Sequence, residues 1–211
     1  KMAVGQCKYI LITNADGGIL NDPILLRLAE NHFWISLADS DIQLWAQGVA
    51  VHSGLDVQIG EPDVSPLQLQ GPNSGLIMQE LFGESIMDLR YYWLREVDLD
   101  GIPLIVSRTG WSSELGYEIW CHPKNAPAVW EAIWTAGEPH GIAPLGLDAL
   151  DMLRIEAGLI FASHEFCPQT SPYEAGIGFT VAMKSKEEDF VGRAALQREA
   201  PESRHRVMGL K

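Results

Sequence analysis

The stretch Asn14-Ala15-Asp16-Gly17-Gly18-Ile19-Leu20-Asn21-Asp22-Pro23 places an acidic side chain just past a double-glycine turn. A Gly-Gly pair tolerates positive φ, so the chain can reverse sharply there. Apolar residues 9–12 before the turn and 24–26 after it predict two strands. We therefore expect a hairpin that holds Asp22 where two strands leave a core, a position suited to binding a ligand amine. A plain hairpin turn with acidic residues is the alternative.

The composition is that of a packed globular protein. Of 211 residues, 46% are hydrophobic and seven are Trp, and this length allows one or two domains. No stretch reaches the roughly 18 uncharged apolar residues that a membrane span needs, so we expect no membrane partner. The formal net charge of −13 argues against a nucleic-acid partner, because phosphate binding requires clustered Lys and Arg.

The cysteines and the chain ends bear on location. Cys7, Cys121 and Cys167 are odd in number and far apart, which predicts free thiols in a cytoplasmic, reducing compartment rather than a disulfide framework. No targeting segment is visible. Residues 206–211 are typical of a strand that is just beginning, and we expect both ends to be cut.

Antiparallel strand pairs interrupted by helices predict an α+β protein. Strands are expected at residues 33–37, 64–70, 91–99, 102–107 and 115–120, and Asp100-Gly101 is a strong hairpin signal. Helices are expected at residues 73–82, 144–158 and 193–198, and from a cap at Asp39 or Ser40 to Gly54.

A further helix is expected to begin after Asn125, which can serve as its N-cap. The residues expected to face the core on the last two long helices are Val129, Trp130, Ile133 and Trp134 on one, and Leu147, Leu150, Leu153 and Ala157 on the other.

Several kinds of catalytic site are absent from the sequence. There is no dinucleotide-binding fingerprint and no phosphate loop. His164, Glu165 and Cys167 stand together but are more typical of a polar loop than of a metal site. Residues 110–113 resemble a nucleophile elbow, but Glu114 stands where that motif needs Gly.

We therefore expect chemistry based on neither a metal nor a covalent nucleophile. Acidic side chains beside turns remain, at Asp22, Glu114, Glu118 and Asp148. A ligand rich in N–H donors, such as a pterin, would need ionised acceptors of this kind.

Seven segments in this order resemble the folate-binding region of the glycine-cleavage T-protein (aminomethyltransferase) superfamily. Together they span nearly the whole chain, and the ordered set is far more specific than any one of them. They are Gly17-Gly18-Ile19-Leu20-Asn21-Asp22, Leu69-Gln70-Gly71-Pro72, Ser107-Arg108-Thr109-Gly110-Trp111-Ser112, Gly116-Tyr117-Glu118-Ile119, residues 144–159, Ser171-Pro172-Tyr173-Glu174-Ala175-Gly176 and Asp189-Phe190-Val191-Gly192-Arg193.

The resemblance implies a T-protein-like α+β fold with antiparallel sheets and packed helices. It implies a folate-binding domain over residues 1–204 that lacks its N-terminal part, and the start of a C-terminal barrel domain at 205–211, the rest of that domain being missing. It also implies tetrahydrofolate as cofactor and no metal. The implied partner is a small one-carbon donor or a lipoyl carrier protein.

The resemblance assigns roles residue by residue. Asp22 matches the catalytic aspartate, which helps position or activate the folate acceptor. The residues implied to line the folate site are Tyr9, Ile24, Trp111, Glu118 and Arg108. Core packing is the alternative for Tyr9 and Trp111, a surface strand position for Glu118, and a solvated charge for Arg108.

Two departures leave the branch of the superfamily open. Asn21 replaces the first of two aspartates usual in the glycine-cleavage enzyme, and this segment, like Trp111, resembles the dimethylsulfoniopropionate demethylase branch. Leu150 stands where the glycine-cleavage enzyme has a folate-contacting arginine, yet the surrounding helix is of the glycine-cleavage type.

The implied function is transfer of an aminomethyl or methyl group to tetrahydrofolate. The alternatives are a demethylase-like methyltransferase, a folate domain fused to an oxidoreductase, and a non-catalytic folate-binding accessory protein. Accessory relatives carry a Lys-Gly-Cys-Tyr motif that this chain lacks, since Cys167 lies in Phe166-Cys167-Pro168.

Overall fold

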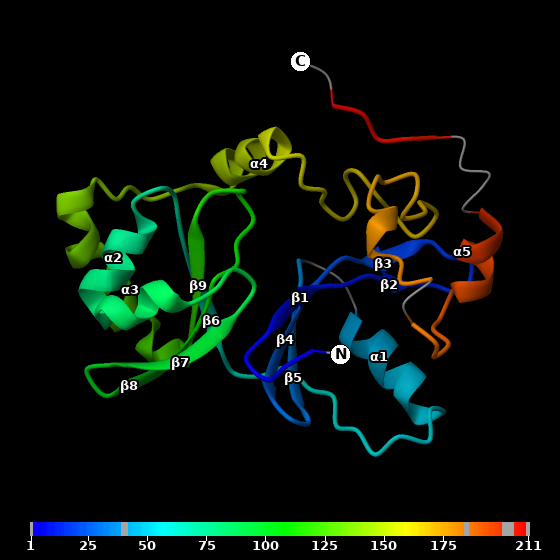
Figure 1. The fold of residues 1–211 in the computed structure, drawn as a ribbon, viewed down its shortest axis with the longest axis horizontal. Helices are drawn as coiled ribbons and strands as arrows, with labels where there is room; N and C mark the ends of the chain where they lie inside the picture. The colour runs from blue at the N-terminus through cyan, green and yellow to red at the C-terminus, as the bar shows by residue number, and fades with distance from the viewer. Residues whose placement is uncertain (1, 39–41, 184–185, 200–204, 210–211) are drawn as a thin grey trace. The chain divides into compact units, whose positions relative to one another are not determined.

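The computed structural model describes residues 2–38, 42–183, 186–199 and 205–209 (Figure 1). The chain divides into two compact units. One comprises Lys1–Lys8, Leu26–Trp34 and Pro62–Leu159, and the other comprises Tyr9–Leu25, Ile35–Glu61 and Ile160–Lys211. Helices and antiparallel strands alternate in the chain, which confirms the α+β class.

A four-stranded antiparallel sheet organises the first unit. Its strands are β6 (Ser65–Gln70), β7 (Leu94–Leu99), β8 (Ile102–Ser107) and β9 (Gly116–Cys121), in the order β6-β9-β8-β7. The predicted hairpin between β7 and β8 is confirmed, because Leu99 pairs with Ile102. Asp100 and Gly101 both have positive φ, 50° and 84°, as a two-residue turn of this kind requires.

Helices α2 (Ser74–Phe82) and α3 (Ala126–Gly137) cover one face of this sheet (Figure 1). Met78, Val106, Ile119 and Val129 are fully enclosed in the core between them. The predicted stripe of α3 was partly wrong: Trp130 is 48% exposed. The helical period carries the buried stripe from Val129 through Ile133 to Ala136, so Trp130 falls to the side of it.

Helix α4 (Leu147–Glu156) also departs from its predicted face. Leu147, expected to point inward, is 83% exposed, while Arg154 is 1% exposed. Leu150, Leu153 and Ala157 are half-buried. Burial of the arginine is tolerated because its guanidinium has partners: Nε donates to Asp151 at 2.7 Å and an Nη donates to the carbonyl oxygen of Leu159 at 3.2 Å.

The predicted glycine hairpin is confirmed in the second unit, where β2 (Ile12–Thr13) pairs antiparallel with β3 (Ile19–Asn21). Gly17 has φ of +88°, a conformation that favours glycine. Gly18 is required for space, because an added Cβ would lie 1.8 Å from the carbonyl oxygen of Pro168. The Asn14 side chain accepts hydrogen bonds from the backbone N–H groups of Asp16 and Gly18.

The single strand expected over residues 9–12 is divided in two. Strand β1 (Cys7–Tyr9) belongs to a three-stranded sheet in the order β1-β4-β5, whereas β2 pairs with β3. The chain therefore changes partner at Ile10. The remaining strands are β4 (Ile24–Ala29) and β5 (His32–Ser36).

The remaining helices agree with the sequence. They are α1 (Ile42–Val51) and α5 (Arg193–Glu199), and short 3-10 turns lie at Glu84–Asp88, Pro123–Asn125, Glu138–His140 and Gly178–Thr180. The caps expected for α1 at Asp39 and Ser40 lie outside the described residues. Asn125 stands at the N-cap position of α3 as predicted, but its side chain makes no capping hydrogen bond.

The last described segment is extended without strand pairing. Residues 206–209 form no strand, contrary to the prediction for 206–211, of which 210–211 are outside the described residues. The expected domain boundary between residues 204 and 205 stays a prediction, because residues 200–204 also lie outside the described residues.

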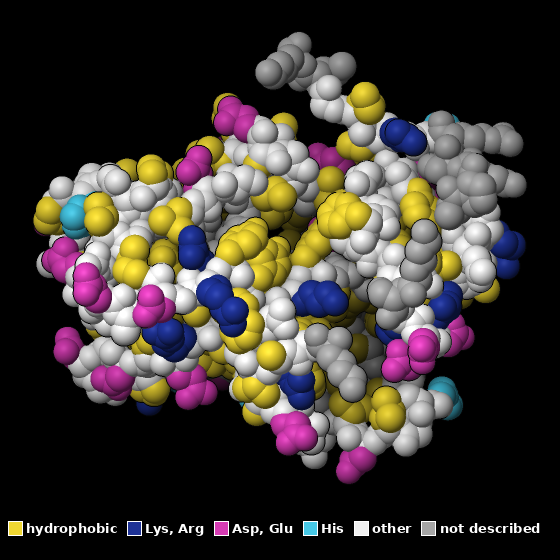
Figure 2. Space-filling view, viewed as in Figure 1, with side chains coloured by type: hydrophobic (Ala, Val, Ile, Leu, Met, Phe, Trp, Pro, Cys, Tyr) yellow, Lys and Arg dark blue, Asp and Glu magenta, His cyan; other side chains and the backbone are white. Residues whose placement is uncertain are grey.

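The cysteines and the surface bear on the expectations about disulfides, charge and membrane spans. Cys7, Cys121 and Cys167 are free, as expected, and the first two are buried while the third is exposed. Figure 2 shows acidic side chains dispersed over the face drawn, among apolar and basic ones. Within the described residues, no helix has the length and apolar character needed to cross a membrane.

Candidate functional site

Asp22 follows β3 and is held by its neighbours in the second unit. The Tyr9 hydroxyl donates to Asp22 Oδ2 at 2.8 Å. The Asp22 backbone N–H donates to Asn21 Oδ1 at 3.0 Å, and Asn21 Nδ2 donates to the carbonyl oxygen of Ala38 at 3.0 Å. The buried Asn21 thus accepts and donates at once, which an ionised aspartate cannot do. The structure thereby gives a physical reason for the amide at this position.

Burial raises the pKa of Asp22 to about 6, although the hydrogen bonds from Tyr9 and from its own backbone N–H oppose the rise. A carboxyl group of this pKa is mostly ionised at neutral pH and can still take up a proton. General bases work best when their pKa lies near the operating pH. Asp22 therefore has the properties of a group that accepts a hydrogen bond or a proton from a ligand.

Ile24 begins β4 two residues beyond Asp22 and is half-buried. Its side chain is apolar, so it can offer van der Waals contact only. Its assignment to the folate site stays a prediction.

Glu118 lies in the middle of β9, paired with Gln68 of β6 on one side and Ser107 of β8 on the other. It is 8% exposed, so the alternative of a surface strand position is wrong. Because side chains alternate along a strand, it points away from the core that holds Tyr117 and Ile119. A carboxylate is therefore enclosed on the face of the sheet opposite α2 and α3.

Both oxygens of Glu118 accept hydrogen bonds. Gln68 Nε2 donates to Oε1 at 3.2 Å, and the Thr109 hydroxyl donates to Oε2. Burial raises the pKa of Glu118, and these two bonds oppose the rise. The two donors therefore offset part of the cost of burying the charge, and each carboxyl oxygen of Glu118 acts as an acceptor.

A chain of donors extends this arrangement to Trp120. The Trp120 indole N–H donates to Ser107 Oγ at 3.1 Å, and Ser107 Oγ lies 2.7 Å from Thr109 Oγ1. Thr109 gives its only hydroxyl hydrogen to Glu118, so Ser107 must be the donor to Thr109. The order of donation is thus fixed from the indole to the carboxylate, which orients Glu118.

Trp111 is half-buried beside the buried Arg154 of α4. The guanidinium carbon lies 5.6 Å from the centre of the Trp111 ring, a cation–π distance. This contact combines packing with a charge, so the alternative of plain core packing does not fully describe Trp111. Its role in folate binding stays a prediction.

Arg108 contacts the hydrophobic core of the first unit. An Nη of its guanidinium donates to the carbonyl oxygen of Leu89 at 3.1 Å. Burial raises the pKa of Tyr117, and the charge of Arg108 opposes part of this rise. Leu89 and Tyr117 both belong to the hydrophobic core of the first unit. Arg108 Nε is buried and has no hydrogen-bond partner among the described residues. The alternative of a solvated charge is therefore wrong for most of this side chain, and its folate contact stays a prediction.

The structure groups the predicted residues into two clusters. Tyr9 and Asp22 contact each other in the second unit, and Glu118 belongs to the first unit with its donors. That the two acids share one pterin site stays a prediction.

Sequence reasoning did not single out the donors to Glu118, which are Gln68 and Thr109 with Ser107 behind it. A signal was present, since residues 107 and 109 stand two apart and so share a face if the strand continues. It also missed the buried cation Arg154.

Metal binding finds no support in the described ranges, where no group of three or more His, Cys, Asp or Glu could hold an ion. Glu165 accepts from the backbone N–H of Phe161, and Cys167 contacts Thr170 in an exposed loop. Residues 164–167 therefore fit the polar loop that the sequence favoured.

Comparisons with known proteins agree with this architecture. Residues 1–185 match the family described as the GCVT N-terminal domain. The chain is 42% identical over 220 residues to a trimethylamine-oxide aldolase of Ruegeria pomeroyi, covering 99% of the chain and 28% of that protein. It is 36% identical over 201 residues to the dimethylsulfoniopropionate demethylase DmdA of the same organism, covering 95% and 54%.

Among solved structures, the chain is similar to the glycine cleavage system aminomethyltransferase T from Bartonella henselae. The TM-score is 0.82 at 27% identity, covering 95% of this chain and 54% of that one. The chain thus spans about half or less of the length of these relatives.

Proposed function

The chain belongs to the GCVT N-terminal domain family, and we therefore propose that it takes part in tetrahydrofolate-dependent transfer of a methyl or aminomethyl group. The observation that carries the proposal is Asp22, a half-buried carboxyl held by Tyr9 with a pKa of about 6. Carboxyl groups whose pKa is raised by burial cluster at functional sites.

The residues present fit a reduced pterin. The amino group and adjacent N–H of a pterin form a pair of donors, and Glu118 already accepts two donors in its present surroundings. Tetrahydrofolate would supply the nitrogen that accepts the one-carbon unit.

In this proposal the chain's own residues orient the folate ring and accept a hydrogen bond or a proton from it. Thr109, backed by Ser107, and Gln68 hold the Glu118 carboxyl group in a fixed direction, so that it orients the ring. Asp22, ionised at neutral pH, accepts a hydrogen bond or a proton at the reacting nitrogen. Positioning of donor and acceptor contributes on the order of 7–11 kcal/mol at best.

Two kinds of one-carbon donor are compatible with the relatives. One is an aminomethyl group on a lipoyl carrier protein, and the other is a methyl group on a small sulfonium or amine compound. Asn21 favours a demethylase-like methyltransferase, because an amide at this position is the feature that resembles the demethylase branch. Its amide bridges Asp22 and Ala38 in a way that an ionised aspartate could not.

The test is a transfer assay with tetrahydrofolate and a panel of lipoyl-bound aminomethyl, dimethylsulfoniopropionate, trimethylamine oxide and dimethylglycine. We expect one donor to be used, and Asp22→Asn to lower turnover about 10²–10⁴-fold while the protein stays folded. Asp16→Asn, in the exposed part of the same turn, is the matched control. Full turnover in Asp22→Asn would exclude its catalytic role, and failure to bind tetrahydrofolate would refute the proposal.

A further inference from the structure

Gln70 is the last residue of β6, and its side chain occupies a space that two glycines leave open. A Cβ added to Gly110 or to Gly116 would overlap the amide atoms of Gln70. Neither glycine has a φ in the left-handed region, so the backbone conformation does not require glycine at these positions. The absent side chains therefore admit the amide of Gln70 beside residues 108–115, the loop that joins β8 to β9.

The amide of Gln70 makes two hydrogen bonds to this loop. The Ser112 hydroxyl donates to Gln70 Oε1 at 2.8 Å, and Gln70 Nε2 donates to the carbonyl oxygen of Thr109 at 3.4 Å. Ser112 Oγ also accepts from the backbone N–H of Glu114 at 3.3 Å. Thr109 and Ser112 are both buried. One side chain thus holds the loop on both sides of Trp111.

The loop contains a turn that its surroundings must maintain. Ser113 has φ of +59°, in the left-handed region that residues other than glycine seldom adopt. Such a conformation persists when neighbouring contacts hold it in place. Here the hydroxyl of the preceding residue, Ser112, links the turn to Gln70.

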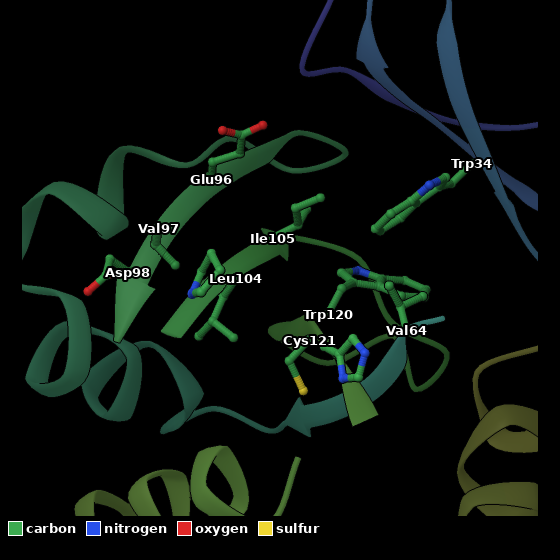
Figure 3. A pocket seen from close by; sticks show the side chains of 11 residues that line it. Trp34, Val64, Glu96, Val97, Asp98, Leu104, Ile105, Trp120 and Cys121 are labelled. Carbon is green, nitrogen blue, oxygen red and sulfur yellow. The ribbon is translucent and has the colours of Figure 1, made fainter. Parts of the chain in front are cut away.

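The loop also carries one of the two donors to Glu118, which is Thr109. Behind Thr109, Ser107 is fixed within the sheet because it accepts from the indole N–H of Trp120. Trp120 is itself almost fully buried, and Figure 3 shows its ring next to that of Trp34, with ring centres 6.0 Å apart. Thr109, in contrast, lies beyond the end of β8, so its position depends on the loop.

We propose that Gln70 is a positioning residue of the folate site, an inference that rests on the proposed function. Gln68 and Gln70 stand two residues apart on β6 and therefore share the sheet face on which Glu118 lies. Gln68 donates to Glu118 Oε1 directly, and Gln70 acts on Oε2 through the loop that carries Thr109. The same loop presents Trp111. A ligand then meets a carboxyl group and an aromatic ring that are already oriented, which lowers the cost of ordering them on binding.

The first measurement needs no folate. Fluorotryptophan is incorporated into the full chain, and the fluorine NMR signal of Trp111 is identified by its loss in Trp111→Phe. Gln70→Met keeps the length of the side chain and removes both hydrogen bonds, so the Trp111 signal should shift and broaden or divide. Gly110→Ala, which displaces the amide by another route, should have the same effect. Gln79→Met, at a half-buried glutamine of α2, is the matched control and should leave the signal unchanged.

The second measurement is the affinity for tetrahydrofolate, by calorimetry without oxygen. Gln70→Met should weaken binding about tenfold, and Gln79→Met should not. Because Gln70 acts partly through Thr109, the double variant Gln70→Met/Thr109→Val should lose less than the product of the two single losses. A residue that merely stabilises the fold would show no such coupling.

An unchanged Trp111 signal in Gln70→Met, an affinity within about twofold of the natural protein, or independent losses in the double variant would overturn the role of Gln70. Failure of the natural protein to bind tetrahydrofolate would refute the proposed function and the folate role with it. The fluorine signals would still decide in that case whether Gln70 holds the loop, so the two failures are distinguishable.

Discussion

Asp22 should reduce the stability of the protein at neutral pH, and replacing it with Asn should remove this effect. The pKa of Asp22 is about 6 in the folded protein, compared with its ordinary value of 3.8. Above pH 6 the carboxyl is ionised in both the folded and the unfolded chain, so the folded protein bears the full cost of burying the charge. As the pH falls from 6 to 4, the folded protein takes up a proton before the unfolded chain does, and the cost disappears.

The size of the effect follows from the two pKa values. Each pH unit between them corresponds to about 1.4 kcal/mol, which gives at most about 3 kcal/mol. The carboxyl is partly exposed and water screens it, so we expect Asp22→Asn to raise the free energy of unfolding at pH 7.5 by about 1–3 kcal/mol. The Tyr9 hydroxyl can still donate to the amide oxygen of Asn.

The measurement is urea unfolding followed by tryptophan fluorescence at pH 4, 6 and 7.5, for the natural chain, Asp22→Asn and Asp16→Asn. The gain of Asp22→Asn should shrink to a small fraction near pH 4, and Asp16→Asn should show no such trend. A gain that does not change with pH, or a loss at pH 7.5, would show that Asp22 is not ionised at a cost. Greater stability with lower turnover would mark Asp22 as a group kept for function.

Three other substitutions test the remaining contacts. Thr109→Val should weaken tetrahydrofolate binding about 5–50-fold by calorimetry, because Glu118 loses a hydrogen-bond donor. Thr109→Ser should retain affinity, and equal losses in the two variants would contradict the donor role of the Thr109 hydroxyl. Arg154→Met should lower the free energy of unfolding by about 1–3 kcal/mol in urea, because the acceptors of its hydrogen bonds lose their donor. An unchanged midpoint would show that these hydrogen bonds do not stabilise the fold. Gly18→Ala should cost more than about 3 kcal/mol in thermal unfolding, since its Cβ would collide with the Pro168 carbonyl, and a tolerated alanine would refute that close approach.

The sequence by itself determined the local turns and the strands that they join. Gly17 and Gly101 adopt the positive φ that their dipeptides predicted, because turn geometry depends on neighbouring residues alone. Alternation along β9 likewise indicated that Glu118 points away from Tyr117. The class of the fold and the identity of the acids near the turns could therefore be predicted.

Only the tertiary structure decided which faces are covered. Alternation places Glu118 on one face of the sheet, but it does not say that Gln68 and Thr109 enclose it there. Helical periodicity predicted that Leu147 faces the core on α4, but Leu147 is 83% exposed and Arg154, two turns further along the same side of the helix, is buried. The reason is that periodicity is a property of one segment, whereas burial and the pKa of a carboxyl depend on groups that other segments bring to it.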